Sequence, residues 1–311
     1  MGRLSAFILG AAAGGGFPQW NCNCGVCRLA WAGDPRAKPR TQASIAVTAG
    51  VADGTRLSPD APPAFVLVNA SPDLRQQIIA TPALQPRGLR DSPIAAVVLT
   101  GGEIDQTAGL LTLRERGPFR LFGTAGTLDT LASNSMFGAL AADVVPRVPV
   151  EAGVAFDLPG GITAEMFVVP GKVPLYLEGD DPQLETETEA NVGVELRAGG
   201  ARIVFIPGAA KLTPAIAGRI ADADAVLFDG TLFADDEMIA AGTGAKTGRR
   251  MGHMPVGGPD GTLKALAGLA RRRILIHINN TNPILIEGSR ERREVEAAGF
   301  EVAEDGMRID A

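Results

Sequence analysis

Short apolar segments rich in β-branched residues recur along the whole chain, and turn residues separate them from segments with helical spacing. The segments that predict strands are 44–48, 65–69, 95–100, 119–122, 165–169, 192–197, 202–206, 225–228 and 274–278. The segments with apolar residues at helical spacing are 72–80, 108–115, 124–133, 211–221, 235–241 and 261–269. Because some strands follow one another directly while others alternate with helices, the pattern predicts an α/β fold with a mixed sheet covered by helices.

No linker interrupts this pattern. Glycine and proline are spread between the apolar runs, without a Gly/Ser tract, a charge block or a low-complexity segment. With 46% hydrophobic residues the 311-residue chain can bury a large core. We therefore expect one domain over residues 1–311, with surface loops at 60–63 and 180–190.

Charge and hydropathy exclude several classes of partner. The formal net charge of -6 argues against general binding of nucleic acid or of an anionic membrane surface. The apolar run 4–13 resembles a secretory signal, but glycines and cysteines follow it. A run of about ten residues is also too short to span a bilayer. We expect a cytoplasmic protein that binds a small molecule, and the oligomeric state, with a homodimer as one option, stays open.

All three cysteines of the chain, Cys22, Cys24 and Cys27, lie in one C-x-C-x-x-C run. Three thiolates at this spacing can supply three corners of a tetrahedral zinc site from a single loop. The alternatives are three buried free thiols, or one disulfide with a thiol left over. The spacing favours zinc, with a fourth ligand from a distant part of the chain. The preceding Gly14–Gly16 run lacks a phosphate-loop pattern and indicates a tight turn.

A polar turn follows the predicted strand 95–100. Glu103, Asp105 and Gln106 stand there, where side chains project into the crevice in which α/β proteins bind ligands. All three are candidate oxygen ligands or acid/base groups. Ordinary helix capping by Asp105 and a solvated Glu103 explain the same pattern, so the sequence leaves both readings open.

The chain has only two histidines. His277 ends an apolar run and precedes a polar Asn-Asn-Thr-Asn-Pro segment, a position that suits a ligand or a proton carrier. His253 lies in a glycine-rich loop, which is either a surface connection or part of a binding site. Asp229 ends the strand 225–228 and either anchors its own turn or joins the same site.

Together these segments resemble the coenzyme PQQ (pyrroloquinoline quinone) biosynthesis protein B family of the metallo-β-lactamase-fold superfamily. The resemblance covers nearly the whole chain through the segments 11–27, 69–73, 104–111, 228–231, 251–253 and 277–283. It implies a four-layer αββα sandwich of the metallo-β-lactamase type. It also implies a metal or substrate cleft at one edge of two facing sheets.

The chain departs from the hydrolases of this superfamily. Where they carry H-x-H-x-D-H, this sequence has Gly101, Glu103, Asp105 and Gln106. Where they place a later histidine and a bridging aspartate, it has Lys172 and Gly208. Since only the aspartate of the motif remains, a binuclear zinc hydrolase is disfavoured.

The resemblance implies instead a non-haem iron(II) site in an oxygen-dependent hydroxylase, which would hydroxylate the tyrosine ring of a glutamate-tyrosine-derived precursor of PQQ. Asp105 and His277 match two of the three implied ligands, and Gln106 stands where the family has a histidine. An amide oxygen binds iron(II) more weakly than imidazole. Either Glu103 or Asp229 then supplies the third ligand, or the activity is reduced.

The resemblance implies roles for further residues. His253 joins Asp105 and His277 as a catalytic candidate that places the substrate. An older description of the family is a non-catalytic carrier of PQQ or its precursor, for which Arg249, Arg250 and Lys172 are candidate partners of the carboxylates.

A related phosphodiesterase family completes the cysteine site with a histidine three residues after the late metal-binding histidine. Asn280 occupies that place here. The fourth corner of the structural zinc site therefore belongs to Asn280, to water or to another residue folded over the loop.

Overall fold

Two β-sheets form the centre of the computed structural model, which describes residues 4–50, 64–177 and 187–311. The first sheet has the order β14-β1-β2-β3-β4-β5-β6. Its strands are β1 (Leu4–Gly10), β2 (Ser44–Ala49), β3 (Phe65–Val68), β4 (Ile94–Val98), β5 (Arg120–Gly123), β6 (Arg147–Pro149) and β14 (Arg308–Asp310). The strands from β3 to β6 are parallel, and β1 is antiparallel to both of its neighbours.

The second sheet has the order β13-β12-β11-β10-β9-β8-β7. Its strands are β7 (Ala155–Leu158), β8 (Ile162–Val168), β9 (Val192–Ala198), β10 (Ala201–Ile206), β11 (Ala225–Asp229), β12 (Arg272–Ile276) and β13 (Glu301–Val302). The strands from β10 to β13 are parallel, whereas β7, β8 and β9 pair antiparallel. Both sheets are thus mixed, as the sequence predicts.

Side chains of one strand alternate between two hydrophobic clusters, which defines the layers. On β11, Ala225 and Leu227 belong to the cluster between the sheets, while Val226 and Phe228 belong to the cluster beneath the outer helices. The outer face of the first sheet packs in a third cluster that includes Leu74 and Leu128. Because a strand points successive side chains to opposite faces, both sheets are covered on both sides. The four-layer αββα sandwich is confirmed.

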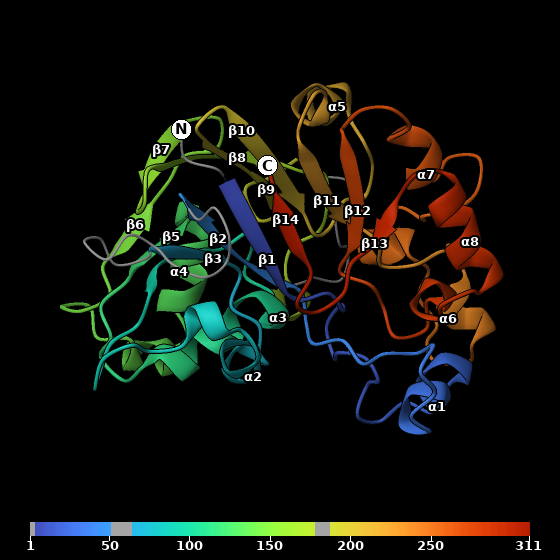
Figure 1. Ribbon diagram of the computed structural model, residues 1–311, viewed down its shortest axis with the longest axis horizontal. Helices are drawn as coiled ribbons and strands as arrows, with labels where there is room; N and C mark the ends of the chain where they lie inside the picture. Colours follow the sequence, from blue (N-terminus) through green and yellow to red (C-terminus); the bar gives the residue numbers. More distant parts are fainter. Residues whose placement is uncertain (1–3, 51–63, 178–186) are drawn as a thin grey trace.

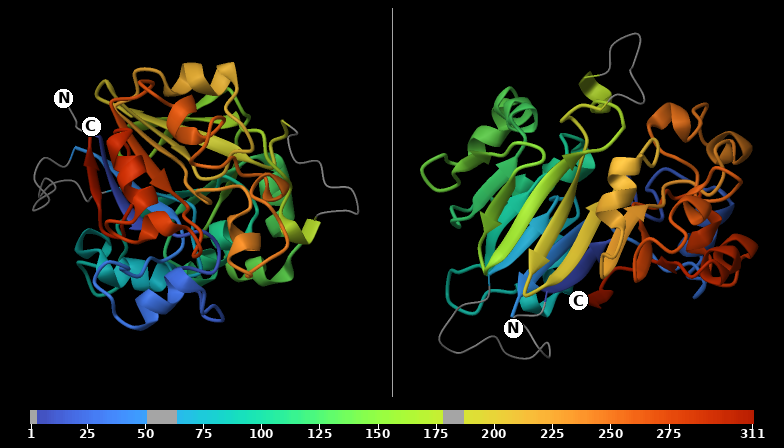
Figure 2. Two further views of the ribbon diagram at one scale, coloured as in Figure 1. Left: turned by 90° about the vertical axis from the view of Figure 1, so that its right-hand side faces the viewer. Right: turned by 90° about the horizontal axis from the view of Figure 1, so that it is seen from above.

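Helices cover the two outer faces, as Figures 1 and 2 show. The first sheet is covered by α2 (Leu74–Ala80), the 3-10 helix η2 (Ala108–Leu113) and α4 (Ala125–Ala132). The second sheet is covered by α5 (Pro214–Ile220), α7 (Thr262–Ala265) and α8 (Arg290–Ala297). The remaining short helices are α1 (Gly25–Trp31), α3 (Ile104–Thr107), α6 (Glu237–Ala240) and η5 (Arg249–Met251), and all but α1 contribute residues to the cavity described below.

All nine predicted strand segments coincide with strands, but the pattern missed several. The run 4–13, whose apolar character resembles a signal, contains the interior strand β1, whose residues Leu4, Ala6 and Ile8 are fully buried. The other missed strands are short: β6, β7, β13 and β14. The predicted helix 108–115 is a 3-10 helix that continues α3. The predicted loop 60–63 and most of 180–190 lie outside the described residues.

Among the residues described, none of the helices has both the length and the apolar character needed to cross a lipid bilayer.

Candidate metal and substrate site

The carboxyl ends of β4, β11 and β12 meet at one edge of the sandwich. β11 and β12 run parallel and in register, so their ends coincide. The end of β4 is joined to the second sheet because Gly101 bridges Asn191 and the Val192 amide donates to the Thr100 carbonyl at 3.0 Å. Polar residues at strand ends far apart in sequence are therefore gathered in one place, where α/β folds bind ligands.

Asp105 and His277 face each other across this edge. Asp105 lies in the first turn of α3, and its Oδ2 is 3.0 Å from Nε2 of His277, which directly follows β12. His277 adopts a left-handed backbone conformation with φ of 58°. Non-glycine residues rarely adopt this conformation outside places where the surrounding structure enforces it, and such places are often functional.

Asp229 holds the second histidine. Its Oδ2 is 2.7 Å from Nδ1 of His253 and accepts a hydrogen bond from the Ala209 amide at 2.9 Å. Asp229 is fully buried, whereas His253 retains 17% of its side-chain exposure. The rings of His253 and His277 stack with centroids 5.4 Å apart. The carboxylate therefore fixes the ring of His253 from behind and leaves its other edge toward solvent.

These contacts shift the pKa values of the group. Burial alone would lower the pKa of His277, but the hydrogen bond to Asp105 and the charges of Asp105 and Asp229 raise it above its ordinary value. Burial alone would raise the pKa of Asp105, but the hydrogen bond and charge of His277 lower it. Burial would likewise raise the pKa of Asp229, and the charge of His253 and its hydrogen bond lower it. Both carboxyl groups are thus ionised at neutral pH.

A cavity of about 440 Å³ opens in front of these residues. The polar residues that line it are Gln19, Gln42, Glu103, Asp105, Gln106, Lys172, Asn191, Thr231, Lys246, His253, His277 and Asn279. Lys172 Nζ lies 3.7 Å from Glu103 Oε1. The size suits a small molecule, and the two lysines suit a ligand with carboxylate groups.

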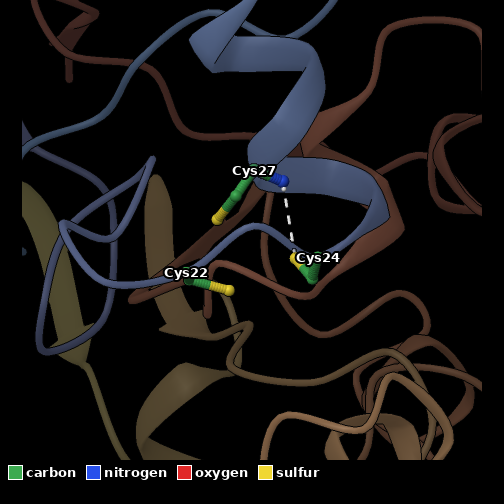
Figure 3. Close-up of side chains that lie close together, drawn as sticks. All are labelled: Cys22, Cys24 and Cys27. Carbon is green, nitrogen blue, oxygen red and sulfur yellow. Dashed lines mark hydrogen bonds between the residues drawn. The ribbon is translucent and has the colours of Figure 1, made fainter.

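The three cysteines form a second cluster, next to the edge and on a separate loop. Their sulfur atoms point toward one another, as Figure 3 shows, and all lie within 4.8 Å of each other. Cys24 caps α1 by accepting a hydrogen bond from the Cys27 amide at 3.4 Å. Tetrahedral zinc with sulfur at about 2.3 Å needs sulfur atoms about 3.8 Å apart, so a small contraction fits the ion. Burial raises the pKa of the Cys27 thiol to about 12.

Asn280 closes the fourth side of the cysteine cluster. Its main-chain oxygen is 3.8 Å from Cys24 Sγ and 3.7 Å from Cys27 Sγ, and its side-chain nitrogen donates to Cys27 Sγ at 3.2 Å. The main-chain oxygen thus lies beside two of the three sulfur atoms of the cluster. The loop of α1 and the turn after β12 meet at this residue.

The comparisons with known proteins agree with this architecture. A family model described as beta-lactamase superfamily domain matches residues 65–278. The coenzyme PQQ synthesis protein B of Methylobacterium nodulans is 53% identical over 98% of this chain and 99% of its own length. That of Gluconacetobacter diazotrophicus is 52% identical with the same coverage. The chain belongs to the coenzyme PQQ synthesis protein B family.

Solved structures support the same assignment. The crystal structure of Zn²⁺-bound PqqB from Methylobacterium extorquens is 51% identical, covers 99% of this chain and 100% of its own, and superimposes with a TM-score of 0.92. A diphosphatase of the PhnP family shares the fold, with 18% identity, coverage of 100% and 98%, and a TM-score of 0.66. The family resemblance inferred from the sequence motifs is confirmed.

Two glycines of this PQQ synthesis protein B family member, Gly101 and Gly208, lie at the edge of the sandwich that carries the cavity. A Cβ atom on Gly101 would come within 2.6 Å of Gln106 Oε1 and 3.0 Å of the Ala190 carbonyl oxygen. A Cβ atom on Gly208 would lie 3.4 Å from Cε1 of His253. A larger side chain at Gly101 would therefore require a local shift of Gln106 and of the main chain at Ala190.

The predicted site residues fall into four groups, one of which is the cysteine cluster with Asn280 described above. Glu103, Asp105, Gln106, Lys172, His253 and His277 line one cavity. Asp229 lies behind it, with both carboxylate oxygens in hydrogen bonds. Arg249 lines a separate depression with Asp235, and Arg250 does not line the cavity.

Six polar cavity residues of this PQQ synthesis protein B family member were not among the predicted site residues: Gln19, Gln42, Asn191, Thr231, Lys246 and Asn279. Thr231 follows the end of β11 by two residues. Asn191 and Lys246 come from segments that show no pattern. The position of Thr231 after a strand end is a signal that could have indicated it.

Proposed function

We propose that this protein acts in the synthesis of coenzyme PQQ, and that its cavity holds iron(II) for oxygen-dependent hydroxylation of the tyrosine ring in a glutamate-tyrosine-derived precursor. The observation that carries the proposal is the 3.0 Å separation of Asp105 Oδ2 and His277 Nε2 beside the cavity. Two ligands bound at right angles to one ion, each about 2.1 Å from it, are about 3.0 Å apart. One carboxylate and one imidazole with open positions beside them suit iron(II).

The third protein ligand comes from Glu103 or Gln106. Both line the cavity with Asp105. The carboxylate oxygens of Asp229 are instead occupied by hydrogen bonds with Ala209, Thr231 and His253. Gln106 Oε1 accepts a hydrogen bond from the Glu103 amide at 3.3 Å, a long contact that leaves a lone pair for a cation. The carboxylate of Glu103 would bind more strongly, at the cost of its contact with Lys172.

The residues of the cavity supply binding and proton transfer. Iron(II) bound there would supply the activation of oxygen, with an external two-electron reductant. Lys172 and Lys246 would bind the carboxylates of the precursor. His253, held through Nδ1 by Asp229, would offer its other ring nitrogen to the phenol hydroxyl of the substrate.

We also infer a structural zinc ion at the cysteine cluster. The relative from Methylobacterium extorquens was solved with zinc bound. In the present chain three thiols lie close together, and the main-chain oxygen of Asn280 next to Cys24 and Cys27 would supply the fourth donor. A closed site with four protein donors is typical of structural zinc.

A carrier of PQQ or its precursor is the second candidate. The observation that favours it is Gln106, a neutral amide at the position where the resembled family has a histidine ligand. The cavity lined by Lys172 and Lys246 would bind a polycarboxylate without catalysing a reaction of it.

One experiment separates the two functions. Zinc-loaded protein is charged with iron(II) without oxygen and given the precursor, ascorbate and then oxygen, and mass spectrometry follows the addition of one oxygen atom. We expect hydroxylated product from the wild type and none from Asp105→Asn, which keeps the shape but removes the charge. Absence of product from folded, iron-loaded wild type would overturn the hydroxylase, and tight binding of PQQ by the same sample would favour the carrier.

A further inference from the structure

The hydroxyl group of Thr231 lies at the centre of the two histidines and Asp229. Its Oγ1 is 2.6 Å from Asp229 Oδ1, 3.1 Å from His253 Nδ1 and 2.9 Å from His277 Nδ1. It also lies 3.0 Å from the main-chain oxygen of His277. Thr231 is only 4% exposed. One buried hydroxyl is therefore within hydrogen-bond distance of every member of this group.

Distances assign the protons of this network. The hydroxyl has one proton, and the carboxylate oxygen of Asp229 at 2.6 Å is its shortest and only charged acceptor. His253 Nδ1 donates to the other oxygen of Asp229, because that contact is shorter than its contact with Thr231. The lone pairs of the Thr231 oxygen then accept the Nδ1 proton of His277. Donation in this direction leaves Nε2 of His277 facing Asp105.

This network argues against a cation among Asp229, His253 and His277. Their ligand atoms lie within 4.8 Å of one another, which by itself would suit an ion. The space among the three is taken by the Thr231 oxygen, at hydrogen-bond distances from all of them. Asp229 and the two Nδ1 atoms thus form a hydrogen-bonded support, and the cation position lies on the other side of the His277 ring.

The main chain strengthens the same support. The Asn279 amide donates to the Thr231 carbonyl at 3.0 Å, and Asn282 Nδ2 donates to the Gly230 carbonyl at 2.9 Å. These bonds join the segment after β11 to the turn that contains His277 in its left-handed conformation. Thr231 is therefore held at a fixed place relative to the ring that it contacts.

We propose that Thr231 is a positioning residue, an inference that rests on the iron site proposed above. The hydroxyl of Thr231 fixes the ring of His277 so that His277 Nε2 and Asp105 face the same ion. A second hydrogen bond to the far nitrogen of a histidine ligand sets its tautomer and orientation, and its loss typically costs about 10- to 100-fold in metal affinity.

The test compares Thr231→Val, which removes the hydroxyl at nearly constant shape, with Thr231→Ser, which keeps it. Iron(II) is titrated without oxygen into zinc-loaded protein, and binding is measured directly. We expect Thr231→Val to bind iron(II) about 10- to 100-fold more weakly and Thr231→Ser to bind nearly as the wild type does. If Thr231→Val does not fold, Thr231→Ala removes the same hydroxyl and is compared with Thr231→Ser.

A second readout is independent of iron. Because the chain has two histidines, labelling histidine nitrogen gives NMR signals from only two imidazole rings in iron-free protein. We expect a slowly exchanging Nδ1 proton of His277 in the wild type and in Thr231→Ser, and its loss in Thr231→Val. Wild type that shows this proton but binds no iron(II) would overturn the iron site and leave the role of Thr231 intact. A His277 Nδ1 proton and iron affinity that persist in Thr231→Val would overturn the positioning role alone.

Discussion

The side-chain nitrogen of Asn280 donates a hydrogen bond to Cys27 Sγ at 3.2 Å, and Asn280 lies three residues after His277. The cysteine cluster therefore holds the turn that delivers a histidine to the cavity. Two further bonds reinforce this link, because the Ile278 amide donates to the Ala11 carbonyl and the Ala13 amide to the Ile278 carbonyl. Stability of the cluster and geometry of the cavity are thus coupled through one short segment.

Removing one thiol should release the zinc ion and loosen this turn. We expect Cys27→Ser to lose zinc and to lower the free energy of unfolding on the order of 3 kcal/mol, because a structural metal contributes directly to folding. Metal analysis and urea unfolding measure the two effects. Asn23→Ala, at an exposed position between the cysteines, is the matched control and should keep one zinc ion. Full zinc content in Cys27→Ser would contradict a cluster that binds zinc through this thiol.

Asn280 should support zinc through its main chain, so its side chain is dispensable for the ion. We expect Asn280→Ala to keep one equivalent of zinc, while loss of the hydrogen bond to Cys27 lowers stability by about 1 kcal/mol. The same metal analysis and unfolding experiment measure both. A zinc loss as complete as in Cys27→Ser would instead assign the side chain as the fourth ligand.

The sequence predicts the parts of the site that are local. The cysteine cluster lies within positions 22–27, so its spacing alone indicates zinc. Asp105 and His277 are 172 residues apart, and only a strand-end position in each case hinted that they meet. The position of Thr231 after a strand end indicates a place near the ligand-binding edge, but it gives no indication of the three groups that surround the hydroxyl.

The fold shows the same limit. Central strands such as β2 and β11 are apolar runs bounded by turns, and the sequence pattern finds them. β1 was missed because its apolar run extends through residues 11–13 near the start of the chain, where it resembles a secretory signal. β13 has two residues and is recognised only by its pairing with β12, which is a tertiary contact.

Replacing Gln106 with histidine should strengthen iron binding. An imidazole is a better ligand for iron(II) than an amide oxygen, and we expect Gln106→His to raise the affinity about tenfold, which corresponds to about 1.4 kcal/mol. Anaerobic titration of zinc-loaded protein measures it. Gln106→Met, which fills the space without a comparable nitrogen or oxygen donor, should not bind iron(II) more tightly than the wild type. Unchanged affinity in Gln106→His would mean that position 106 does not face the ion.

Lys246 should contribute to the binding of a polycarboxylate. It lines the cavity but is exposed, so its contact with a carboxylate is worth about 1 kcal/mol or less. We therefore expect Lys246→Gln to weaken PQQ binding by up to about fivefold, with less effect at high salt. Calorimetric titration with PQQ measures the change. Lys264 is an exposed lysine on α7 outside the cavity, and Lys264→Gln should leave the affinity for PQQ unchanged. An equal loss of affinity in both variants would mean that only the net charge of the protein matters, and not a contact of Lys246 with PQQ.

Glu237 should make the protein less stable as the pH rises toward neutrality. Burial raises the pKa of Glu237 to about 7, although Thr281 and the Phe233 amide donate hydrogen bonds to its carboxyl group at 2.6 and 2.8 Å. In the unfolded chain the pKa of Glu237 is about 4.3, so the folded state binds the proton of Glu237 more tightly than the unfolded state does. The stabilisation of the folded state by this proton is therefore complete below about pH 4.

This contribution is lost as the pH rises to about 7, and allowing for the partial exposure of Glu237 it amounts to about 2 kcal/mol. Glu237→Gln mimics the neutral form and should flatten the dependence of the free energy of unfolding on pH between about 4 and 7. Glu115→Gln, whose side chain is 65% exposed, should keep the slope of the wild type. Urea unfolding across this range decides between them, because an unchanged slope in Glu237→Gln would show that Glu237 is already ionised in the folded protein at low pH.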